Sequence, residues 1–256
     1  MRKAVVLDKS GTIVNPCRVI YSLATGELLF HVSTLKYVVE RGEALVNIRG
    51  SLKSLAEGNI QGASLKVSCM AFKPMPNLNI DSLKDTKVID GIKLVMNEAQ
   101  THCNSQMGAC AAVIVNPKGE ITHVVGLGGR LYDDVEEVVQ TMMCRGVDVF
   151  LATGNCKEMT LKCADLLNIP RRFVLFDASP EDKRDWVRKL RGFYGSVIMV
   201  GNDLNDLIAM KEADVSVIVT RTGTTAHEKV SECKDVDYIV PSLKEVEGIV
   251  EGITHP

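Results

Sequence analysis

Four short polar segments of this chain carry the residue types that phosphoryl transfer requires. Such a reaction needs a nucleophile, cations that neutralise charge, donors that orient the phosphate and a metal ion. The segment Asp8-Lys9-Ser10-Gly11-Thr12 offers a carboxylate that can attack phosphorus and form an acyl-phosphate. Thr153-Gly154 offers a hydroxyl and backbone N–H groups, and Lys183 offers an ammonium. The turn from Gly201 to Asp206 offers carboxylate and amide oxygens, which suit Mg²⁺.

Each segment has an ordinary structural alternative when it is taken alone. An Asp after a strand often caps a turn, and strand–Thr–Gly–helix junctions are common. A single lysine is usually a solvated surface residue, and a turn rich in Asn and Asp is a frequent loop. The combination is far more specific, because all four segments occur in this order and each lies at a predicted strand end.

Strands and helices alternate along the chain. Apolar runs end at Asp8, at Thr153 and at Gly201, and such runs suit a parallel sheet that is covered on both faces. Helical spacing follows at residues 156–167, and Ser179 is typical of a helix cap. The sequence therefore predicts an α/β fold with a doubly wound parallel sheet, in which ligands bind beyond the carboxyl ends of the strands. The predicted strands are 4–7, 147–152, 172–176, 196–200, 215–219 and 238–240, with further helices near 133–144 and from Ser242.

Residues 15–106 follow a different pattern. Residues 18–22 and 28–33 resemble the arms of a hairpin, and a helix is predicted near residues 84–100. Loops longer than about 15 residues are unusual inside a compact domain, so we expect an inserted, smaller α+β domain that acts as a cap. The predicted domains are 1–14 with 107–256 as the core, including two strand candidates within 110–131, and 15–106 as the insert.

Composition excludes several classes of protein. The 256 residues are 46% hydrophobic and 24% charged, which is ordinary for a globular protein. A net charge of −2 gives no bulk attraction to nucleic acid or to an anionic membrane, and five scattered histidines argue against a zinc site. No signal peptide is evident, and no apolar run approaches the roughly 20 residues that span a bilayer, so a cytoplasmic location is expected.

The eight cysteines form no C-x-x-C pair and are predicted to be mostly buried, reduced thiols: Cys17, Cys69, Cys103, Cys110, Cys144, Cys156, Cys163 and Cys233.

The four segments together resemble the haloacid dehalogenase-like superfamily, and most closely the phosphorylation domain of P-type ATPases. That domain carries the signatures D-K-T-G-T, T-G-D, P-x-D-K and G-D-G-x-N-D-x-x-A-L-x-x-A-D-V. The resemblance covers roughly residues 1–14 and 107–250 and does not clearly extend to the insert, where no nucleotide-binding signature is found. The counterparts here are Asp8 to Thr12, Thr153-Gly154-Asn155, Pro180-Glu181-Asp182-Lys183 and Gly201 to Val215.

The resemblance implies a role for each site residue. Asp8 would be the nucleophile and a Mg²⁺ ligand, and Lys183 would neutralise both this carboxylate and the phosphate. The implied catalytic residues are Asp8, Ser10 and Lys183; the phosphate-binding residues are Thr153, Gly154, Lys183 and Asn205; the metal ligands are Asp8, Ser10 through its backbone carbonyl, Asn202 and Asp206.

Three positions depart from the family pattern. Ser10 stands where phosphatases of the superfamily carry an Asp that protonates the leaving group and activates water, and such acid–base catalysis is typically worth about 10²–10⁴-fold. Slow hydrolysis and a long-lived aspartyl-phosphate are therefore expected. Asn202 replaces the metal-binding Asp, which should weaken Mg²⁺ affinity, and Asn155 replaces the Asp of T-G-D.

Three functions remain open at this point. The first is a Mg²⁺-dependent phosphohydrolase that acts on a small phosphorylated metabolite, with the insert closing over the substrate to exclude water. The second is a soluble ATPase or phosphotransferase, which Ser10 favours. The third is a phosphate-responsive regulatory module that has lost turnover, which Ser10 and Asn202 both support.

Overall fold

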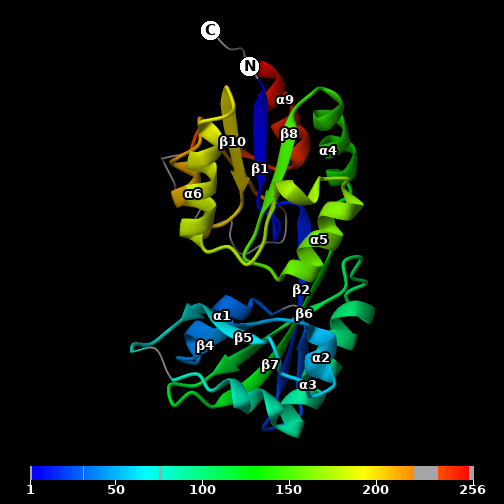
Figure 1. The fold of residues 1–256 in the computed structure, drawn as a ribbon, viewed down its shortest axis with the longest axis vertical. Helices are drawn as coiled ribbons and strands as arrows, with labels where there is room; N and C mark the ends of the chain where they lie inside the picture. The colour runs from blue at the N-terminus through cyan, green and yellow to red at the C-terminus, as the bar shows by residue number, and fades with distance from the viewer. Residues whose placement is uncertain (1, 31, 75–76, 222–235, 254–256) are drawn as a thin grey trace. The chain divides into compact units, whose positions relative to one another are not determined.

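The computed structural model describes residues 2–30, 32–74, 77–221 and 236–253 (Figure 1). The chain divides into two compact units by its internal contacts. Unit 1 comprises residues 1–15 and 131–256, and unit 2 comprises residues 16–130. The chain therefore leaves unit 1 only a few residues after Asp8 and returns to it just before Tyr132.

Unit 1 contains a six-stranded parallel sheet in the order β12-β11-β10-β1-β8-β9. β8 and β9, which come next in the sequence of this unit, lie on one side of the central strand β1. The later strands β10, β11 and β12 lie on its other side. The order therefore reverses between β1 and β10, and such a switch point is where ligands bind in open α/β sheets. The strands are β1 (Lys3–Leu7), β8 (Asp148–Ala152), β9 (Val174–Leu175), β10 (Ser196–Gly201), β11 (Val215–Val219) and β12 (Tyr238–Val240).

Helices flank this sheet on both sides. α6 and α7 pack on β10, whereas α4 packs on β8 and on α9. In Figure 1, α6 and α4 lie on opposite sides of the strands. The predicted doubly wound α/β core is thus confirmed. The helices are α4 (Val135–Cys144), α5 (Lys157–Leu166), α6 (Pro180–Arg191), α7 (Leu207–Met210) and α9 (Leu243–Gly252), with short 3₁₀ turns η2 (Arg171–Phe173) and η3 (Leu204–Asp206).

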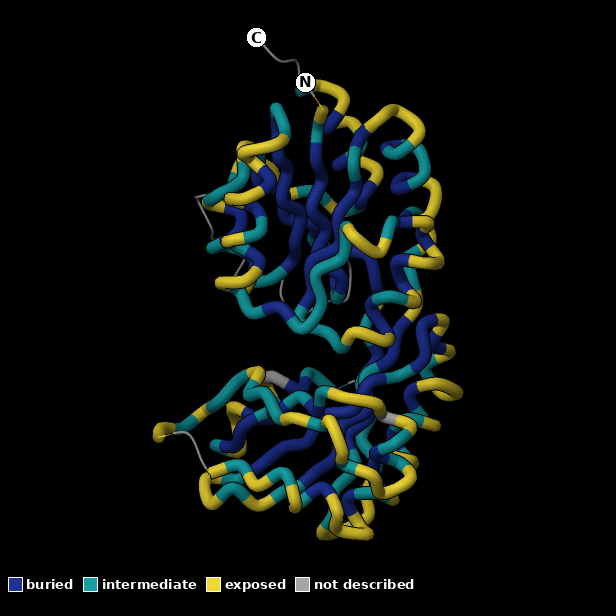
Figure 2. Tube along the Cα trace, viewed as in Figure 1, coloured by how far each residue is buried: buried dark blue, intermediate teal, exposed yellow. Residues whose placement is uncertain are grey.

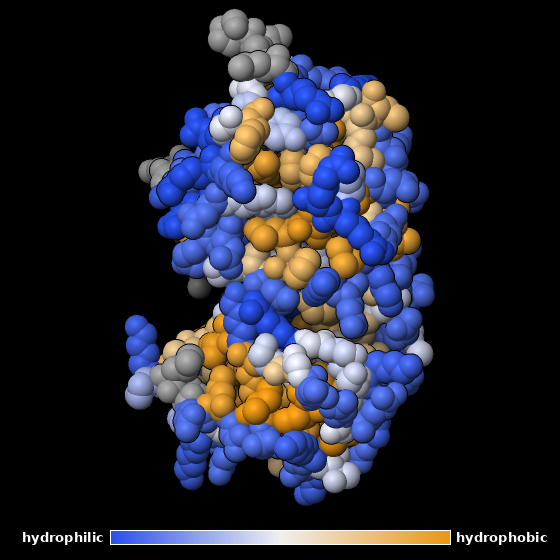
Figure 3. Space-filling model, viewed as in Figure 1, coloured by the Kyte–Doolittle hydropathy of each residue, from blue (hydrophilic) through white to orange (hydrophobic). Residues whose placement is uncertain are grey.

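The core of unit 1 is apolar and aromatic. Val6, Met199 and Val187 are fully buried in one cluster with Phe150, whose ring contacts three other aromatic rings, including that of Trp186. The central strands of both units are largely buried, while many exposed residues lie on the outer helices and turns (Figure 2). Hydrophilic residues cover much of the surface, and apolar ones show on part of unit 2 (Figure 3).

Unit 2 is built on an antiparallel sheet in the order β3-β2-β7-β6-β4-β5. The predicted hairpin is confirmed, because β2 pairs antiparallel with β3. The predicted helix near 84–100 is also confirmed, as α3. The elements are β2 (Val14–Ser22), β3 (Leu28–Phe30), β4 (Ala44–Arg49), β5 (Ser64–Met70), β6 (Cys110–Val115), β7 (Ile121–Leu131), α1 (Thr34–Glu40), α2 (Leu52–Ala56), η1 (Ile80–Lys84) and α3 (Thr86–Thr101).

The second boundary of the insert differs from the prediction. β6 and β7, within residues 110–131, pair with each other and with β4 in the sheet of unit 2, so this unit extends to Arg130 rather than to residue 106. All six residues of β6 are buried. A continuous apolar run of this kind looks the same in sequence as a central strand of a parallel sheet, which is why it was assigned to the core.

The cysteine prediction is wrong in part. Cys17 and Cys103 form a disulfide that ties β2 to the segment after α3, with their Cα atoms 5.8 Å apart. Of the free cysteines that the structure describes, Cys163 is buried, Cys69 is half-buried and Cys144 is exposed. Disulfides are rare in reducing compartments, so the cytoplasmic location stays a prediction.

Every helix in the described ranges is too short or too polar to cross a membrane.

Packing of α3 on the sheet of unit 2 depends on a glycine. A Cβ atom at Gly126 in β7 would lie 2.3 Å from the carbonyl oxygen of Val95 in α3. We expect Gly126→Ala to lower the free energy of unfolding by about 1–3 kcal/mol, because the backbone atoms it meets cannot move aside cheaply. Urea unfolding followed by circular dichroism measures this loss. Gly248→Ala in α9 is the control, since nothing lies within 4 Å of its added Cβ and a helical alanine should add about 0.5–1 kcal/mol. Equal effects of the two changes would contradict this packing.

Candidate active site

Asp8 lies directly beyond the carboxyl end of the central strand β1, at the switch point. Its backbone N–H donates to the carbonyl of Val200 in the neighbouring strand β10, at 2.8 Å. The chain then turns tightly, with the N–H groups of Ile13 and Val14 both donating to the carbonyl of Lys9. Gly11 permits this turn: its φ is +88°, and a Cβ there would lie 2.0 Å from the amide nitrogen of Asn202.

Lys183 is the cation at this strand end. Ser179 and Asp182 form a reciprocal capping box at the start of α6, and Pro180 takes the first position, so the chain enters the helix in one orientation. This places the Lys183 ammonium 2.6 Å from one oxygen of Asp8 and 2.7 Å from one oxygen of Asp206. All three side chains are buried.

Burial and charge act in opposite directions on these groups. Burial raises the pKa of Asp8 to about 6, although the positive charge of Lys183 opposes this shift. Burial alone would lower the pKa of Lys183, but the charges of Asp8 and Asp206 outweigh it and raise this pKa above its ordinary value. At neutral pH the site therefore holds an ionised carboxylate beside a firmly protonated ammonium.

The turn after β10 is organised by Asp206. The carboxylate oxygen of Asp206 that does not contact Lys183 accepts from the backbone N–H groups of Asn202 and Asp203, at 3.1 and 3.3 Å. A Cβ at Gly201 would collide with this carboxylate, so only glycine allows the close approach. Both oxygens of Asp206 are thus in use.

Oxygen atoms suited to a hard cation lie between Asp8 and Asn202. The hydroxyl of Thr12, which is completely buried, lies 3.5 Å from the second oxygen of Asp8 and 3.4 Å from the amide oxygen of Asn202. A carboxylate, an amide oxygen and the nearby carbonyl of Ser10 are the kind of donors that Mg²⁺ takes, with waters filling the remaining positions. No group of three or more His, Cys, Asp and Glu side chains in the described chain could hold a metal ion, so a metal here would depend on amide and carbonyl oxygens.

Ser10, Thr153 and Asn155 form a neutral hydroxyl–amide cluster. The Ser10 and Thr153 hydroxyls both donate to the side-chain oxygen of Asn155, each at 2.8 Å. The backbone of this loop is held by residues 175–178, since the N–H of Thr153 donates to Leu175 and that of Ala178 donates to the carbonyl of Thr153. The Asn155 side chain therefore joins two of the four predicted segments.

The structure brings most of the predicted site residues together. Lys183 contacts both Asp8 and Asp206. Thr12 lies between Asp8 and Asn202. Asn155 connects Ser10 with Thr153. Gly154 lies within the same loop as Thr153. Asn205 differs: it is exposed, and within residues 77–221 no contact ties its side chain to this cluster.

Arg221 is a residue at this end of the sheet that sequence reasoning missed. Its guanidinium donates twice to the carbonyl of Thr12, at 3.0 and 3.1 Å, and twice to the carboxylate of Asp134, both at 2.9 Å. It also lies over the ring of Tyr132, 4.3 Å from its centroid. Asp134 in turn accepts from the N–H of Leu243 at the start of α9. The loop that follows Asp8 is thus held by a buried arginine 209 residues away.

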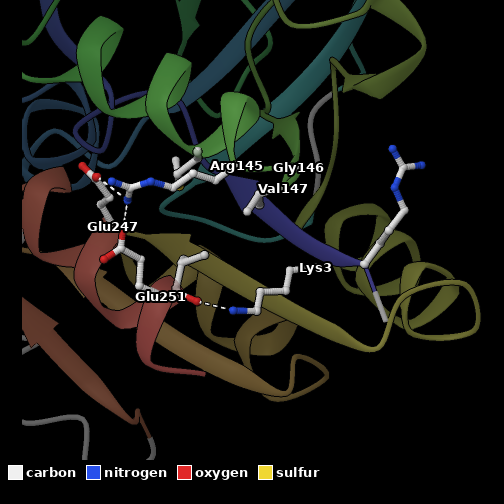
Figure 4. A pocket seen from close by; sticks show the side chains of 9 residues that line it. Lys3, Arg145, Gly146, Val147, Glu247 and Glu251 are labelled. Carbon is white, nitrogen blue, oxygen red and sulfur yellow. Dashed lines mark hydrogen bonds and ion pairs between the residues drawn. The ribbon is translucent and has the colours of Figure 1, made fainter. Parts of the chain in front are cut away.

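A cavity of about 240 Å³ lies at the opposite, amino-terminal end of the same strands (Figure 4). The ammonium of Lys3 donates to the carbonyl of Val250, at 2.7 Å. Arg145 forms ion pairs with both Glu247 and Glu251. These charges are already paired and lie far along β1 from Asp8, so this cavity is separate from the candidate active site.

Comparison with known proteins identifies the family. The model of the haloacid dehalogenase-like hydrolases matches residues 2–214. A soluble P-type ATPase-like phosphatase of Methanocaldococcus jannaschii is 27% identical over 262 residues, which cover 99% of this chain and 94% of that protein. A copper-transporting ATPase of Helicobacter pylori is 23% identical over 274 residues; these cover 97% of this chain but 34% of the ATPase, so the chain spans about a third of its length.

One solved structure supports the fold over the whole chain. A predicted phosphoglycolate phosphatase from Haemophilus somnus matches with a TM-score of 0.53 and covers 97% of this chain and 98% of its own. At 15% sequence identity this likeness concerns the fold alone.

The role of Arg221 can be tested by a conservative change. Arg221→Lys keeps the charge but cannot make paired bonds to Thr12 and to Asp134 at once. We expect the free energy of unfolding to fall by about 1–3 kcal/mol, and hydrogen exchange of the amides of residues 11–14 to accelerate. Urea unfolding and hydrogen–deuterium exchange measure the two effects.

Arg188→Lys is the matched control. Arg188 makes a similar two-point contact with Glu212, but this pair is exposed, so we expect a loss below about 1 kcal/mol. Equal losses for the two variants, or unchanged exchange in the loop after Asp8, would contradict the bracing role of Arg221.

Proposed function

The chain belongs to the haloacid dehalogenase-like hydrolase family, and from this premise we propose that it hydrolyses the phosphate ester of a small metabolite through an aspartyl-phosphate on Asp8. The observation that carries this proposal is the buried contact of 2.6 Å between Asp8 and the Lys183 ammonium, beyond the carboxyl end of the central strand. A carboxylate placed there is ionised at neutral pH and has its charge partly neutralised, so a phosphate dianion can approach it.

In the proposed first step, an oxygen of Asp8 attacks the phosphorus, and the bond from phosphorus to the ester oxygen breaks. The leaving oxygen takes a proton from solvent, and Asp8 becomes an acyl-phosphate. Lys183 lies against Asp8 and stabilises the charge that builds on the phosphoryl oxygens. The hydroxyl of Thr153 would turn from Asn155 to donate to those oxygens, together with the N–H groups around Gly154. In the second step water attacks the phosphorus, releases inorganic phosphate and regenerates the carboxylate.

Mg²⁺ is the proposed cofactor. Its ligands would be the Asp8 carboxylate, the Ser10 carbonyl and the Asn202 side-chain oxygen, and it would supply positive charge against the phosphate. The sequence also suggested Asp206 as a ligand. Because both of its oxygens contact Lys183 or the backbone of the turn, we propose that Asp206 acts by holding Lys183 and Asn202 in place.

The contacts of Ser10 support a slow second step. A serine hydroxyl cannot exchange a proton at neutral pH as a carboxylate does, and the Ser10 hydroxyl already donates to Asn155. The proposed enzyme therefore lacks the usual acid–base group at this position. This favours a long-lived aspartyl-phosphate, and it also supports a second candidate function, in which the phosphoryl group passes to an acceptor other than water.

The nucleophile can be tested directly. We expect Asp8→Asn to reduce hydrolysis of p-nitrophenyl phosphate to background, and EDTA to do the same to the unmodified protein, because both remove a part of the proposed site. Steady-state release of p-nitrophenol is the measurement. Glu181→Gln, an exposed acid in the first turn of α6, should keep its turnover within about twofold. Mg²⁺-dependent turnover that survives in Asp8→Asn would refute the proposal.

The acid–base prediction concerns the lifetime of the intermediate. Ser10→Asp restores a carboxylate beside Asn155, whose amide can rotate to donate to it. We expect the breakdown of hydroxylamine-labile phosphoprotein to accelerate by about 10²-fold, measured by quenching a single turnover at increasing times. Ser10→Asn has the same shape without an acid and should leave the lifetime unchanged. An intermediate that is equally stable in Ser10→Asp would show that water is activated elsewhere.

A further inference from the structure

Unit 2 contains a cavity of its own that the proposed phosphatase site does not use. It is bounded by the β2–β3 hairpin, by α1, by the start of α3 and by the start of β7, and its volume is about 740 Å³. Small-molecule sites usually measure about 300–1,000 Å³ and combine apolar walls with a few converging polar groups. The size of this cavity therefore suits a small organic ligand.

A chain of partly buried hydrogen bonds ends at the wall of this cavity. The hydroxyl of Thr122 donates to the carboxylate of Glu43 at 3.0 Å or to the carbonyl of Ile114 at 3.2 Å. Since neither of these acceptors can donate, the Thr122 oxygen must accept from the ring of His123, whose Nδ1 lies 2.9 Å away. The Nε2 atom of His123 then accepts from the hydroxyl of Tyr37, at 3.0 Å.

This chain fixes the hydrogen-bonding character of Tyr37. Because its proton points to His123, the oxygen of Tyr37 presents only lone pairs to a ligand, and it can accept but not donate. Burial lowers the pKa of His123, which agrees with a neutral ring that accepts. Tyr37 and His123 both line the cavity, so a ligand that meets Tyr37 must bring an N–H or O–H donor.

The charges around the cavity favour a cation. Three carboxylates line it, those of Glu27, Asp85 and Glu120, and no ion pair joins any of them to a cation in the described parts of the chain. The lining cations are Arg41 and Lys87. Arg41 is already paired with the buried Glu43, at 2.8 Å, so its charge is neutralised within the protein. With Arg41 counted together with Glu43, the three carboxylates outnumber the remaining lining cation, Lys87, so the net charge around the cavity is negative.

Apolar side chains line the same cavity as these acidic groups. Leu23, Leu29, Val88 and Ile121 form part of the wall. A cavity lined by both carboxylates and apolar side chains suits a ligand in which methylene groups connect ammonium groups. We propose that this cavity binds a linear aliphatic amine that carries two or more ammonium groups, with one N–H donated to the oxygen of Tyr37. This site is independent of the chemistry at Asp8.

A nucleotide is the ligand that this proposal excludes from the cavity. Its phosphates would lie beside three carboxylates, and Lys87 is the one lining cation left without an acidic partner in the described residues. Like charges placed at short range cost binding free energy, which salt screens only in part. Competition between ATP and an amine therefore separates the two assignments.

The test is isothermal titration calorimetry of the whole chain with spermidine. We expect binding that weakens as salt increases, and about tenfold weaker binding in Asp85→Asn/Glu120→Gln. Tyr37→Phe should weaken it by about fivefold, because the accepting oxygen is lost. Lys87→Gln should strengthen binding severalfold, since it removes a repelling charge; a gain of affinity cannot come from misfolding. Asp8→Asn should bind spermidine as tightly as the unmodified protein, whether or not that residue is a nucleophile.

Glu57→Gln is the control for general surface charge. Glu57 is an exposed acid of the same unit that does not line the cavity, and its loss should leave spermidine affinity unchanged. The proposal is overturned if spermidine does not bind, if Glu57→Gln weakens binding as much as the cavity variants do, or if ATP binds there and Lys87→Gln abolishes its binding.

Discussion

The buried contact of Lys183 with Asp8 and Asp206 is the constraint on which the rest of unit 1 depends. Two carboxylates without access to water cannot both stay ionised unless a cation lies between them. Removing one partner of such a buried group typically costs about 3–5 kcal/mol, a large part of the roughly 5–15 kcal/mol that keeps a domain folded. The end of β1, the cap of α6 and the turn after β10 must therefore be placed together, and the same arrangement leaves a partly neutralised carboxylate at the switch point.

Neutral side chains around this triad determine what chemistry it can support. Asn155 and Asn202 provide amide oxygens where the family pattern carries carboxylates, and Ser10 provides a hydroxyl. Each of these groups contacts a neighbour in the site, and none of them adds negative charge to it. Less negative charge eases the approach of a phosphate dianion but weakens the attraction for a metal cation. Under the proposed mechanism, this balance would favour formation of a phosphoenzyme over its breakdown.

Features that depend on local sequence pattern, such as the strands and their polar ends, could be predicted. Contacts between residues far apart in the sequence could not. The alternation of apolar runs with Asp8, Thr153 and Gly201 was enough to predict the parallel sheet and its ligand-binding edge. Arg221 could not be found, because its partner Thr12 lies 209 residues away and no spacing rule connects them. The disulfide of Cys17 with Cys103 joins residues 86 positions apart, and it was not predicted for the same reason. β6 was assigned to the wrong sheet because burial on both faces removes the alternation that marks an antiparallel strand.

Arg221 also limits how far the family pattern explains this site. It follows the region that the family model matches, which ends at residue 214, yet it donates to the carbonyl of Thr12, only four residues after Asp8. The loop after β1 is thus fixed at two points. The backbone N–H of Asp8 donates to β10, and the carbonyl of Thr12 accepts from the guanidinium of Arg221. The other partner of this guanidinium is Asp134, which precedes α4 and accepts from the N–H of Leu243 in α9. The position of the loop after Asp8 therefore depends on the packing of Arg221 and α9, so family signatures alone do not define the candidate active site.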